Sequence, residues 1–190
     1  MPNYLIHKPY GYISQFISNE TKRKNKKLLG ELFDFPKGIM AIGRLDEDSE
    51  GLLLLTTDGK LSEKIRSKSI EKEYYAQVDG IITNEAIEKL KNGVEIGILG
   101  KKYFTDKCKA RIISEPNFPK RTVPIRMHRP TSWVSITLTE GKLRQVRKMT
   151  AAVGFPTLRL VRVRIGELII KNLVPGKVEL IDNNFLNIIT

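Results

Sequence analysis

An acidic segment between Gly43 and Gly51 holds the residues best suited to acid–base or nucleophilic chemistry. Four carboxylates lie within five residues there, at positions 46, 47, 48 and 50. A carboxylate beside nucleic acid repels phosphate unless a cation neutralises it or it takes part in a reaction. Asp46 follows the apolar Leu45 and stands two residues after Arg44, whose guanidinium could pair with Asp46 or with a phosphate. We therefore take Asp46 as the candidate catalytic residue and the other three as an exposed acidic turn.

A second segment, residues 140–149, could bind anions. We expect a helix over 144–153, in which Arg144, Arg147 and Lys148 fall at positions i, i+3 and i+4 and share one face. No acidic residue occurs from Lys142 to Arg164, so these cations have no local carboxylate partner. The face is suited to binding phosphate or an anionic side chain, and a merely solvated basic helix is the alternative.

Two adjacent tyrosines, Tyr74 and Tyr75, lie in a predicted strand over 74–78. Successive side chains of a strand point to opposite faces, so one ring can line a cleft while the other faces away. We expect Tyr74 to be exposed and able to stack on a base, and Tyr75 to fill the core.

The charge of the chain points to a polyanionic partner. Lys and Arg number 33 against 21 Asp and Glu, a net charge of +12. The excess is uneven: residues 1–30 carry six basic and one acidic residue, residues 101–130 nine and two, and residues 142–164 seven and none. Basic surfaces around an acidic middle are typical of proteins that bind a phosphate backbone.

Several classes of site are not supported by the composition. Cys108 is the single cysteine, and the two histidines are too few for a structural zinc site, so we expect neither a disulfide nor a metal. The sequence contains neither a phosphate-binding loop motif nor a dinucleotide-binding glycine motif, and we expect no nucleotide cofactor. The apolar runs are too short to span a membrane and no leader pattern is present, so a cytoplasmic protein is expected.

Short segments bounded by turn residues predict a large sheet with few helices. Strands are expected at 4–6, 13–16, 51–56, 74–78, 110–113, 133–139, 158–163 and 177–181. Helices are expected at 26–33, 60–67, 84–92 with Gly93 as C-cap, and 144–153. Runs of strands with occasional helices favour an α+β fold over a doubly wound parallel sheet. Residues 101–130 hold four of the nine prolines and are expected to be a loop-rich excursion.

Together these segments resemble one branch of the pseudouridine synthases, the RsuA/RluB/RluE/RluF family. The similar elements occur in the family's order and cover nearly the whole chain. They are Lys8-Pro-Tyr-Gly11 with Ile13-Ser-Gln-Phe16, the segment from Gly43 to Gly59, Lys72-x-Tyr74, Glu140-Gly-x-x-Arg-Gln-Val-Arg147 and Gly154-Phe-Pro-Thr-Leu-Arg-Leu-Val-Arg162. Residues 130–133 and 149–157 resemble the E subgroup of this family in particular.

The resemblance implies isomerisation of one uridine in large-subunit ribosomal RNA, without a cofactor and with Asp46 as the essential carboxylate. Asp46 would attack C1′ of the ribose or remove a proton from C2′, and both routes stay open. Arg147 would pair with Asp46 and favour its charged form. Tyr74 would stack on the uracil and could assist loss of the proton from C5. The uridine would be flipped out of its stack into a pocket.

The resemblance also implies RNA-binding residues and a fold. The RNA-binding residues are Lys8, Arg44, Lys142, Arg144, Gln145, Lys148, Arg159 and Arg162. The fold is an α+β domain: a long, mostly antiparallel mixed sheet in two lobes with flanking helices. It forms one catalytic domain over 1–190, with the cleft between the lobes and no S4 RNA-binding module. Leu143, Lys148 and His7 depart from the residues common in the family, which affects fine substrate contacts and not the reaction.

Two other functions fit parts of the sequence. A non-catalytic RNA-binding or ribosome-assembly protein on the same fold would not need Asp46, Tyr74 and Arg147 together. A glycosidase with Asp46 and Asp48 as its carboxylate pair fits poorly with the net charge of +12 and a single tryptophan, Trp133. We therefore expect an RNA pseudouridine synthase that acts as a monomer on large-subunit ribosomal RNA.

Overall fold

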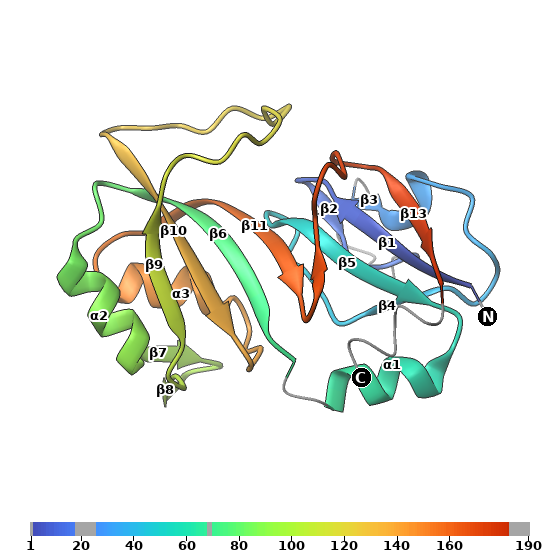
Figure 1. Cartoon of the computed structure of the whole chain (residues 1–190), viewed down its shortest axis with the longest axis horizontal. Coiled ribbons are helices and arrows are strands. Elements are labelled where there is room, and N and C mark those ends of the chain that lie inside the picture. Colours follow the sequence, from blue (N-terminus) through green and yellow to red (C-terminus); the bar gives the residue numbers. More distant parts are fainter. Residues whose placement is uncertain (1, 18–25, 68–69, 183–190) are drawn as a thin grey trace. The chain divides into compact units, whose positions relative to one another are not determined.

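The computed structural model describes residues 2–17, 26–67 and 70–182 (Figure 1). The chain forms two compact units, one from residues 1–70 and 162–190 and the other from residues 71–161. The expectation of a single catalytic domain with a cleft between its lobes stays a prediction. No helix among the described residues is long and apolar enough to cross a membrane.

The first unit is built around strand β5 (Glu50–Thr56), all of whose residues are buried. β1 (Asn3–Lys8) pairs antiparallel with β5 and with β13 (Val178–Ile181), and the short β4 (Met40–Ile42) pairs antiparallel with β5. Four consecutive leucines, 52–55, supply apolar side chains to both faces of β5, so both faces can be covered. This burial places the acidic segment, which enters β5, against a rigid support.

Helix α1 (Gly59–Ser67) follows β5 directly and packs on the first unit's core. The Asp58 side chain accepts hydrogen bonds from the backbone N–H groups of Lys60 and Leu61, at 2.9 and 3.1 Å, and so caps the helix. Its Ile65 joins a buried cluster with strand residues such as Leu5 and Leu54. The helix predicted at 60–67 is therefore confirmed.

The second unit holds an antiparallel sheet of β6 (Lys72–Asp79), β10 (Thr131–Leu138) and β9 (Lys109–Ile113). β11 (Thr157–Ile165) adjoins β6 with its first part and reaches the first unit, next to β5, with its last part. The two-residue strand β12 (Leu168–Ile169) pairs with the end of β11. A separate hairpin is formed by β7 (Glu95–Ile98) and β8 (Lys101–Phe104).

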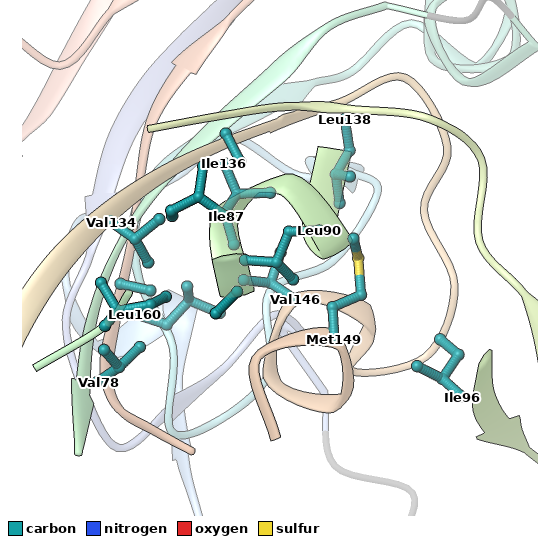
Figure 2. Close-up of a cluster of buried hydrophobic side chains, with 14 residues drawn as sticks. Val78, Ile87, Leu90, Ile96, Val134, Ile136, Leu138, Val146, Met149 and Leu160 are labelled. Atoms are coloured by element: carbon teal, nitrogen blue, oxygen red, sulfur yellow. The ribbon is translucent and has the colours of Figure 1, made fainter. Parts of the chain in front are cut away.

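One face of the second unit's sheet is covered by α2 (Asn84–Asn92) and α3 (Gln145–Ala152). Figure 2 shows Leu90 of α2 and Met149 of α3 among strand side chains such as Val134 and Ile136, all buried. Thr83 caps α2 by accepting a hydrogen bond from Ala86 N at 3.2 Å. The predicted C-cap Gly93 is confirmed: its φ is +92°, and a Cβ there would lie 2.3 Å from the Thr105 carbonyl oxygen.

The helix predicted over 26–33 is wrong. Lys27–Leu28 form strand β3, paired parallel with β2 (Tyr12–Ile13), and a 3₁₀ turn η1 covers Leu29–Glu31. The Leu28 N–H is taken by the Glu31 side chain at 2.7 Å and the Leu29 N–H by the Gln15 carbonyl at 3.0 Å, which leaves no regular helical ladder. The short strands β4, β7, β8 and β12 were not predicted, because two to four residues carry too little periodicity.

Candidate active site

Asp46 lies in a tight loop of the first unit, with its side chain half-buried. The backbone of the preceding residue, Leu45, forms two hydrogen bonds with the Ser14 hydroxyl: Ser14 Oγ donates to Leu45 O at 2.7 Å and accepts from Leu45 N at 2.9 Å. The Asp46 carbonyl accepts from Ser49 N at 3.0 Å, which closes the turn. The backbone that carries the Asp46 carboxylate is thus held from both sides.

The buried side chain of Lys8 also holds this loop in place. Its side chain has no exposed surface, and Nζ donates to the carbonyls of Pro9, Tyr12 and Glu47 at 2.9, 2.5 and 3.5 Å. The Glu47 carbonyl also accepts from Gly11 N at 2.8 Å. Lys8, expected to bind RNA, is therefore corrected to an internal residue that ties the loop of residues 9–12 to the acidic loop.

Burial sets the charge state of Lys8. Desolvation lowers the pKa of Lys8 to about 8, and the carboxylates of the acidic segment, Glu50 foremost, oppose the shift. An ammonium within an acidic loop also offsets the mutual repulsion of its carboxylates. The segment thus combines four carboxylates with one internal cation.

The second unit carries Tyr74 and Arg147. Tyr74 is half-buried and packs against the core beneath the helices, whereas Tyr75, on the opposite face of β6, contacts the ring of Phe118 at a centroid distance of 6.1 Å. The predicted assignment of the two rings is therefore wrong: Tyr74, expected to be exposed, packs against the core, and Tyr75, expected to fill the core, is turned by the register of β6 to the face without helices. Arg147 Nη1, on α3, donates to Thr157 O at 3.3 Å.

Helix α3 begins one residue later than predicted. Arg144 precedes it in the left-handed region, with φ of 54°, so Arg144 does not belong to the helical face of Arg147 and Lys148. Gln145 is buried: its Oε1 accepts from Lys142 N at 2.9 Å, and its Nε2 donates to the Glu140 carboxylate. Gln145 is thus a support of the turn, and its expected role in RNA binding is corrected.

Glu140 anchors this turn to the β8 hairpin. Its carboxylate accepts from the Tyr103 hydroxyl at 2.5 Å and from Asp106 N at 2.9 Å. The hydrogen bond to the Glu140 carboxylate raises the pKa of Tyr103 to about 12, so the phenol remains a donor. Lys142 is exposed, with Nζ 4.8 Å from the centre of the Tyr103 ring.

Two further predicted RNA-binding arginines are buried. Arg162 Nε donates to Leu52 O at 2.7 Å. Arg159 lies over the Phe118 ring at 5.4 Å and donates from Nη2 to Pro119 O at 3.0 Å. Both guanidinium groups position backbone in the structure, so the prediction that they bind RNA is corrected.

The remaining predicted RNA-binding residues have accessible side chains. Arg44, Lys142 and Arg144 are exposed, and Lys148 is half-buried. Arg44 also lines a hollow of ≈ 560 Å³ together with Ser14, Phe16 and Met40. Among the described residues, no group of three or more His, Cys, Asp or Glu side chains could hold a metal ion.

The comparison with known families decides the identity. The family model for RNA pseudouridylate synthase matches residues 3–152, a span that holds Lys8, Asp46, Tyr74 and Arg147. The chain belongs to this family. The resemblance of the sequence motifs to pseudouridine synthases is thereby confirmed.

Relatives of this pseudouridine synthase match it over most of the chain. It is 42% identical over 178 residues to a ribosomal large subunit pseudouridine synthase E of Vibrio parahaemolyticus, covering 91% of this chain and 71% of that protein. The enzyme of that name from Xanthomonas axonopodis is 40% identical, with 90% of this chain and 89% of that protein covered. The predicted similarity to the E subgroup is thus confirmed.

A solved structure supports the fold of this pseudouridine synthase. A pseudouridylate synthase crystal structure matches with a TM-score of 0.79 at 24% identity and covers 100% of this chain and 74% of that one. The predicted α+β pseudouridine synthase fold is confirmed.

Ser14 and Gly11 are supports of the site whose roles were not predicted. Both lie in motifs that the sequence displays, Lys8-Pro-Tyr-Gly11 and Ile13-Ser-Gln-Phe16. Only the fold shows that residues of these motifs hydrogen-bond to the backbone of the Asp46 loop. The contacting residues are more than 30 positions apart in the sequence, as in the Ser14–Leu45 pair with a separation of 31.

The lowered pKa of Lys8 predicts a pH-dependent stability. The unfolded chain holds the proton of Lys8 up to the usual pKa of 10.5, whereas the folded protein releases it near 8. Between these values the unfolded state binds more protons, so the Lys8 contribution to the free energy of unfolding rises with pH, by up to about 3 kcal/mol. Below pH 8 this gain is absent.

Urea unfolding at pH 7.5 and 10 tests the Lys8 prediction. Because other groups also titrate, the wild type is compared with Lys8→Met, which keeps a similar volume without the amine. We expect the stability of the wild type relative to the variant to increase by about 2 kcal/mol over this interval. An unchanged difference would show that Lys8 does not titrate there.

Proposed function

We propose that this pseudouridine synthase converts one specific uridine of large-subunit ribosomal RNA to pseudouridine. The proposal rests chiefly on its 40–42% identity, over about nine-tenths of the chain, to enzymes named ribosomal large subunit pseudouridine synthase E. Exposed cations of the basic segments, such as Arg44 and Arg144, and the net charge of +12 suit an RNA substrate.

The reaction is an isomerisation and needs no added reactant. The bond between N1 of uracil and C1′ of ribose breaks, the uracil turns, and a bond forms between C5 and C1′. The hydrogen on C5 is lost to a base and N1 takes up a proton, so the product has the atoms of the substrate. We propose that no cofactor takes part.

Asp46 is the carboxylate that we propose acts at the ribose. It attacks C1′ to give a covalent ester, or it takes the proton from C2′ to give a glycal, and both routes need an ionised, well-placed carboxylate. The clasp of Leu45 by Ser14 and the tie of Glu47 to Lys8 support this role, because they hold the backbone on both sides of Asp46.

Tyr74 and Arg147 are proposed, from the family resemblance, to act on the same nucleotide. Arg147 pairs with the Asp46 carboxylate, and Tyr74 stacks on the detached uracil and assists proton loss from C5. The target base must leave its stack, which costs a few kcal/mol, and phosphate contacts offset that cost. Arg44, Lys142, Arg144 and Lys148 are the proposed phosphate contacts.

Release of tritium from RNA containing [5-³H]uridine tests the proposed function directly, since the new bond at C5 expels its hydrogen. Unmodified large-subunit RNA treated with the protein should release tritium and gain one carbodiimide-dependent stop of reverse transcription. Tight RNA binding without tritium release or a new stop would instead support a non-catalytic RNA-binding or assembly protein. We further propose that the enzyme is a monomer and works in the cytoplasm.

The Ser14 hydroxyl is predicted to position the catalytic loop. Ser14→Ala removes both contacts to Leu45, so Asp46 is held less accurately and kcat should fall about 10- to 100-fold with little change in KM. Steady-state tritium release measures both constants. Ser62→Ala, at an equally buried serine of α1, is the control and should retain wild-type kcat. A change in KM alone would contradict a positioning role.

A further inference from the structure

A long connection between paired strands stands out in the second unit. β9 ends at Ile113 and β10 begins at Thr131, although Ile113 and Trp133 are direct partners in the antiparallel ladder. The 17 residues between them, 114–130, contain no helix or strand and extend well beyond the ends of both strands (Figure 1). Hairpin connections usually take 2–5 residues, and loops of this length are commonly functional. We call residues 114–130 the arm.

The first limb of the arm is anchored by an aromatic contact. The Phe118 ring lies against Trp133 and Tyr75, with centroid distances of 5.9 and 6.1 Å. Arg159 covers the same ring and donates to Pro119 O at 3.0 Å. These contacts use the sheet face opposite the helices, so they hold the arm without disturbing the core.

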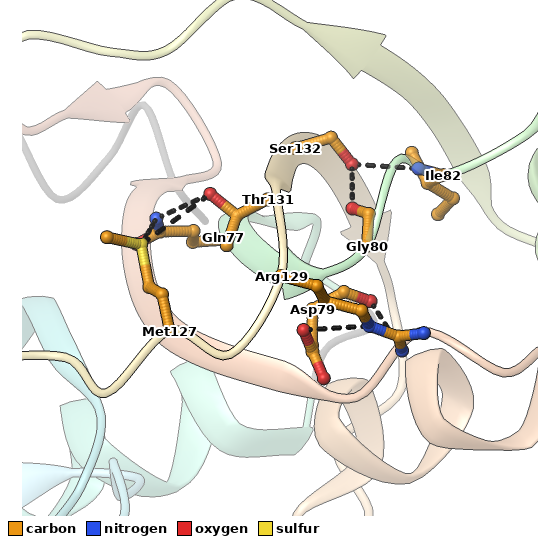
Figure 3. Close-up of polar contacts among 8 residues, drawn as sticks. All are labelled: Gln77, Asp79, Gly80, Ile82, Met127, Arg129, Thr131 and Ser132. Carbon is orange, nitrogen blue, oxygen red and sulfur yellow. Dashed lines mark hydrogen bonds and ion pairs between the residues drawn. The ribbon is translucent and has the colours of Figure 1, made fainter.

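The second limb is anchored by a polar network, drawn in Figure 3. Arg129 Nε donates to Asp79 Oδ1 at 2.9 Å and Arg129 Nη2 to Asp79 O at 3.2 Å. Gln77 Nε2 donates to Thr131 Oγ1 at 3.0 Å and to Met127 Sδ at 3.7 Å. Both limbs are thus fixed to side chains of β6 that alternate on one face, Tyr75, Gln77 and Asp79.

The segment between these anchors presents cations to solvent. Lys120 and Arg126 are exposed, and neither forms an ion pair with the described part of the chain. The arm holds four basic residues and a single acidic one, Glu115. Four prolines, at positions 116, 119, 124 and 130, restrict its backbone, which lowers the entropy lost when a ligand orders it.

We infer that the arm is an RNA-binding element in which Lys120 and Arg126 contact the phosphate backbone of the substrate. The inference deepens the proposed function and rests on it. A protein partner fits less well, because exposed cations without carboxylate partners match a polyanion and such an arm offers only the isolated apolar side chains of Val123 and Met127. The arm supplies binding and takes no part in the reaction.

The test compares two double variants that each remove two positive charges from the second unit. Lys120→Ala with Arg126→Ala changes the arm, and Lys101→Ala with Lys107→Ala changes exposed lysines near the β8 hairpin. Binding of a fluorescent, unmodified ribosomal RNA fragment is followed by anisotropy at 50–200 mM KCl, and kcat by tritium release at saturating RNA.

The arm variant should weaken RNA binding by about tenfold or more and reduce the slope of log K against log salt concentration by about 1.4 to 1.8, with kcat unchanged. The control should change binding by less than about threefold. The exchange Lys120→Arg with Arg126→Lys should restore the wild-type affinity, which a loss caused by misfolding would not explain.

Equal affinities of the arm and control variants would overturn the inference, as would a loss of kcat with unchanged binding. Wild-type protein that binds RNA through the arm but releases no tritium would overturn the proposed function and leave the arm's role standing. A wild type that releases tritium, together with an arm variant of normal affinity, would overturn the inference about the arm and leave the proposed function standing.

Discussion

Asp46→Asn is expected to abolish pseudouridine formation while leaving RNA binding intact. The amide has the shape of the carboxylate but cannot attack C1′ or accept the C2′ proton, so turnover should fall by at least about 10⁴-fold. The loop should keep its structure, because the hydrogen bonds described above that hold it run through the backbone of Leu45, Asp46 and Glu47. Single-turnover tritium release measures the loss.

The neighbouring Asp48 gives a matched control for this prediction. Asp48→Asn removes the same charge from the same half-buried loop, and its turnover should stay within about tenfold of the wild type. RNA affinity of both variants should be equal to or slightly tighter than that of the wild type, since each loses a negative charge that repels phosphate. Asp46→Asn with more than about a tenth of wild-type turnover would remove Asp46 from the reaction.

Gly51→Ala is expected to have the largest effect on stability. A Cβ at Gly51 would lie 2.3 Å from the Arg162 carbonyl oxygen and 2.6 Å from its backbone nitrogen, and φ at Gly51 is +107°. Both close contacts would be with backbone atoms of Arg162 in the neighbouring strand, which cannot move aside as a flexible side chain would. We expect the free energy of unfolding to fall by more than about 4 kcal/mol, enough to unfold much of the protein at 37 °C.

Gly59→Ala is the control for the glycine prediction. Gly59 opens helix α1, and an added Cβ there meets no atom within 4 Å. Alanine favours a helix over glycine by up to about 1 kcal/mol, so this variant should be as stable as the wild type or slightly more stable. Urea unfolding followed by circular dichroism compares the two. A Gly51→Ala protein with a wild-type unfolding midpoint would contradict the close approach of β5 to Arg162.

The close packing at Gly51 links stability to the candidate site. Gly51 pairs with Lys8 in the ladder between β1 and β5, and the acidic segment enters β5 immediately before it. Arg162, whose backbone approaches Gly51, also donates to Leu52 O. The same few residues therefore hold the strand and the base of the Asp46 loop, which accounts for a glycine at the end of the acidic motif.

Local patterns in the sequence were sufficient for most elements of the fold. The leucine run of β5, the Thr83 and Gly93 caps of α2 and the alternation in β10 depend on neighbours within a few residues, so the sequence displays their causes. The order of the motifs along the chain was likewise sufficient to predict the family, because that order depends on the residues themselves and not on how they pack. The predicted helix at 26–33 is wrong because its N–H groups find partners at Gln15 and Glu31.

The tertiary structure alone decided which cations face solvent. Lys8, Arg159 and Arg162 look like phosphate contacts in a basic sequence, yet each donates to backbone carbonyls and is buried. The partner of Arg162 is 110 residues away in the chain, and that of Arg159 is 40 residues away. The residue type gives the charge of a side chain. Whether that side chain contacts solvent, RNA or a distant backbone carbonyl depends on contacts that only folding creates.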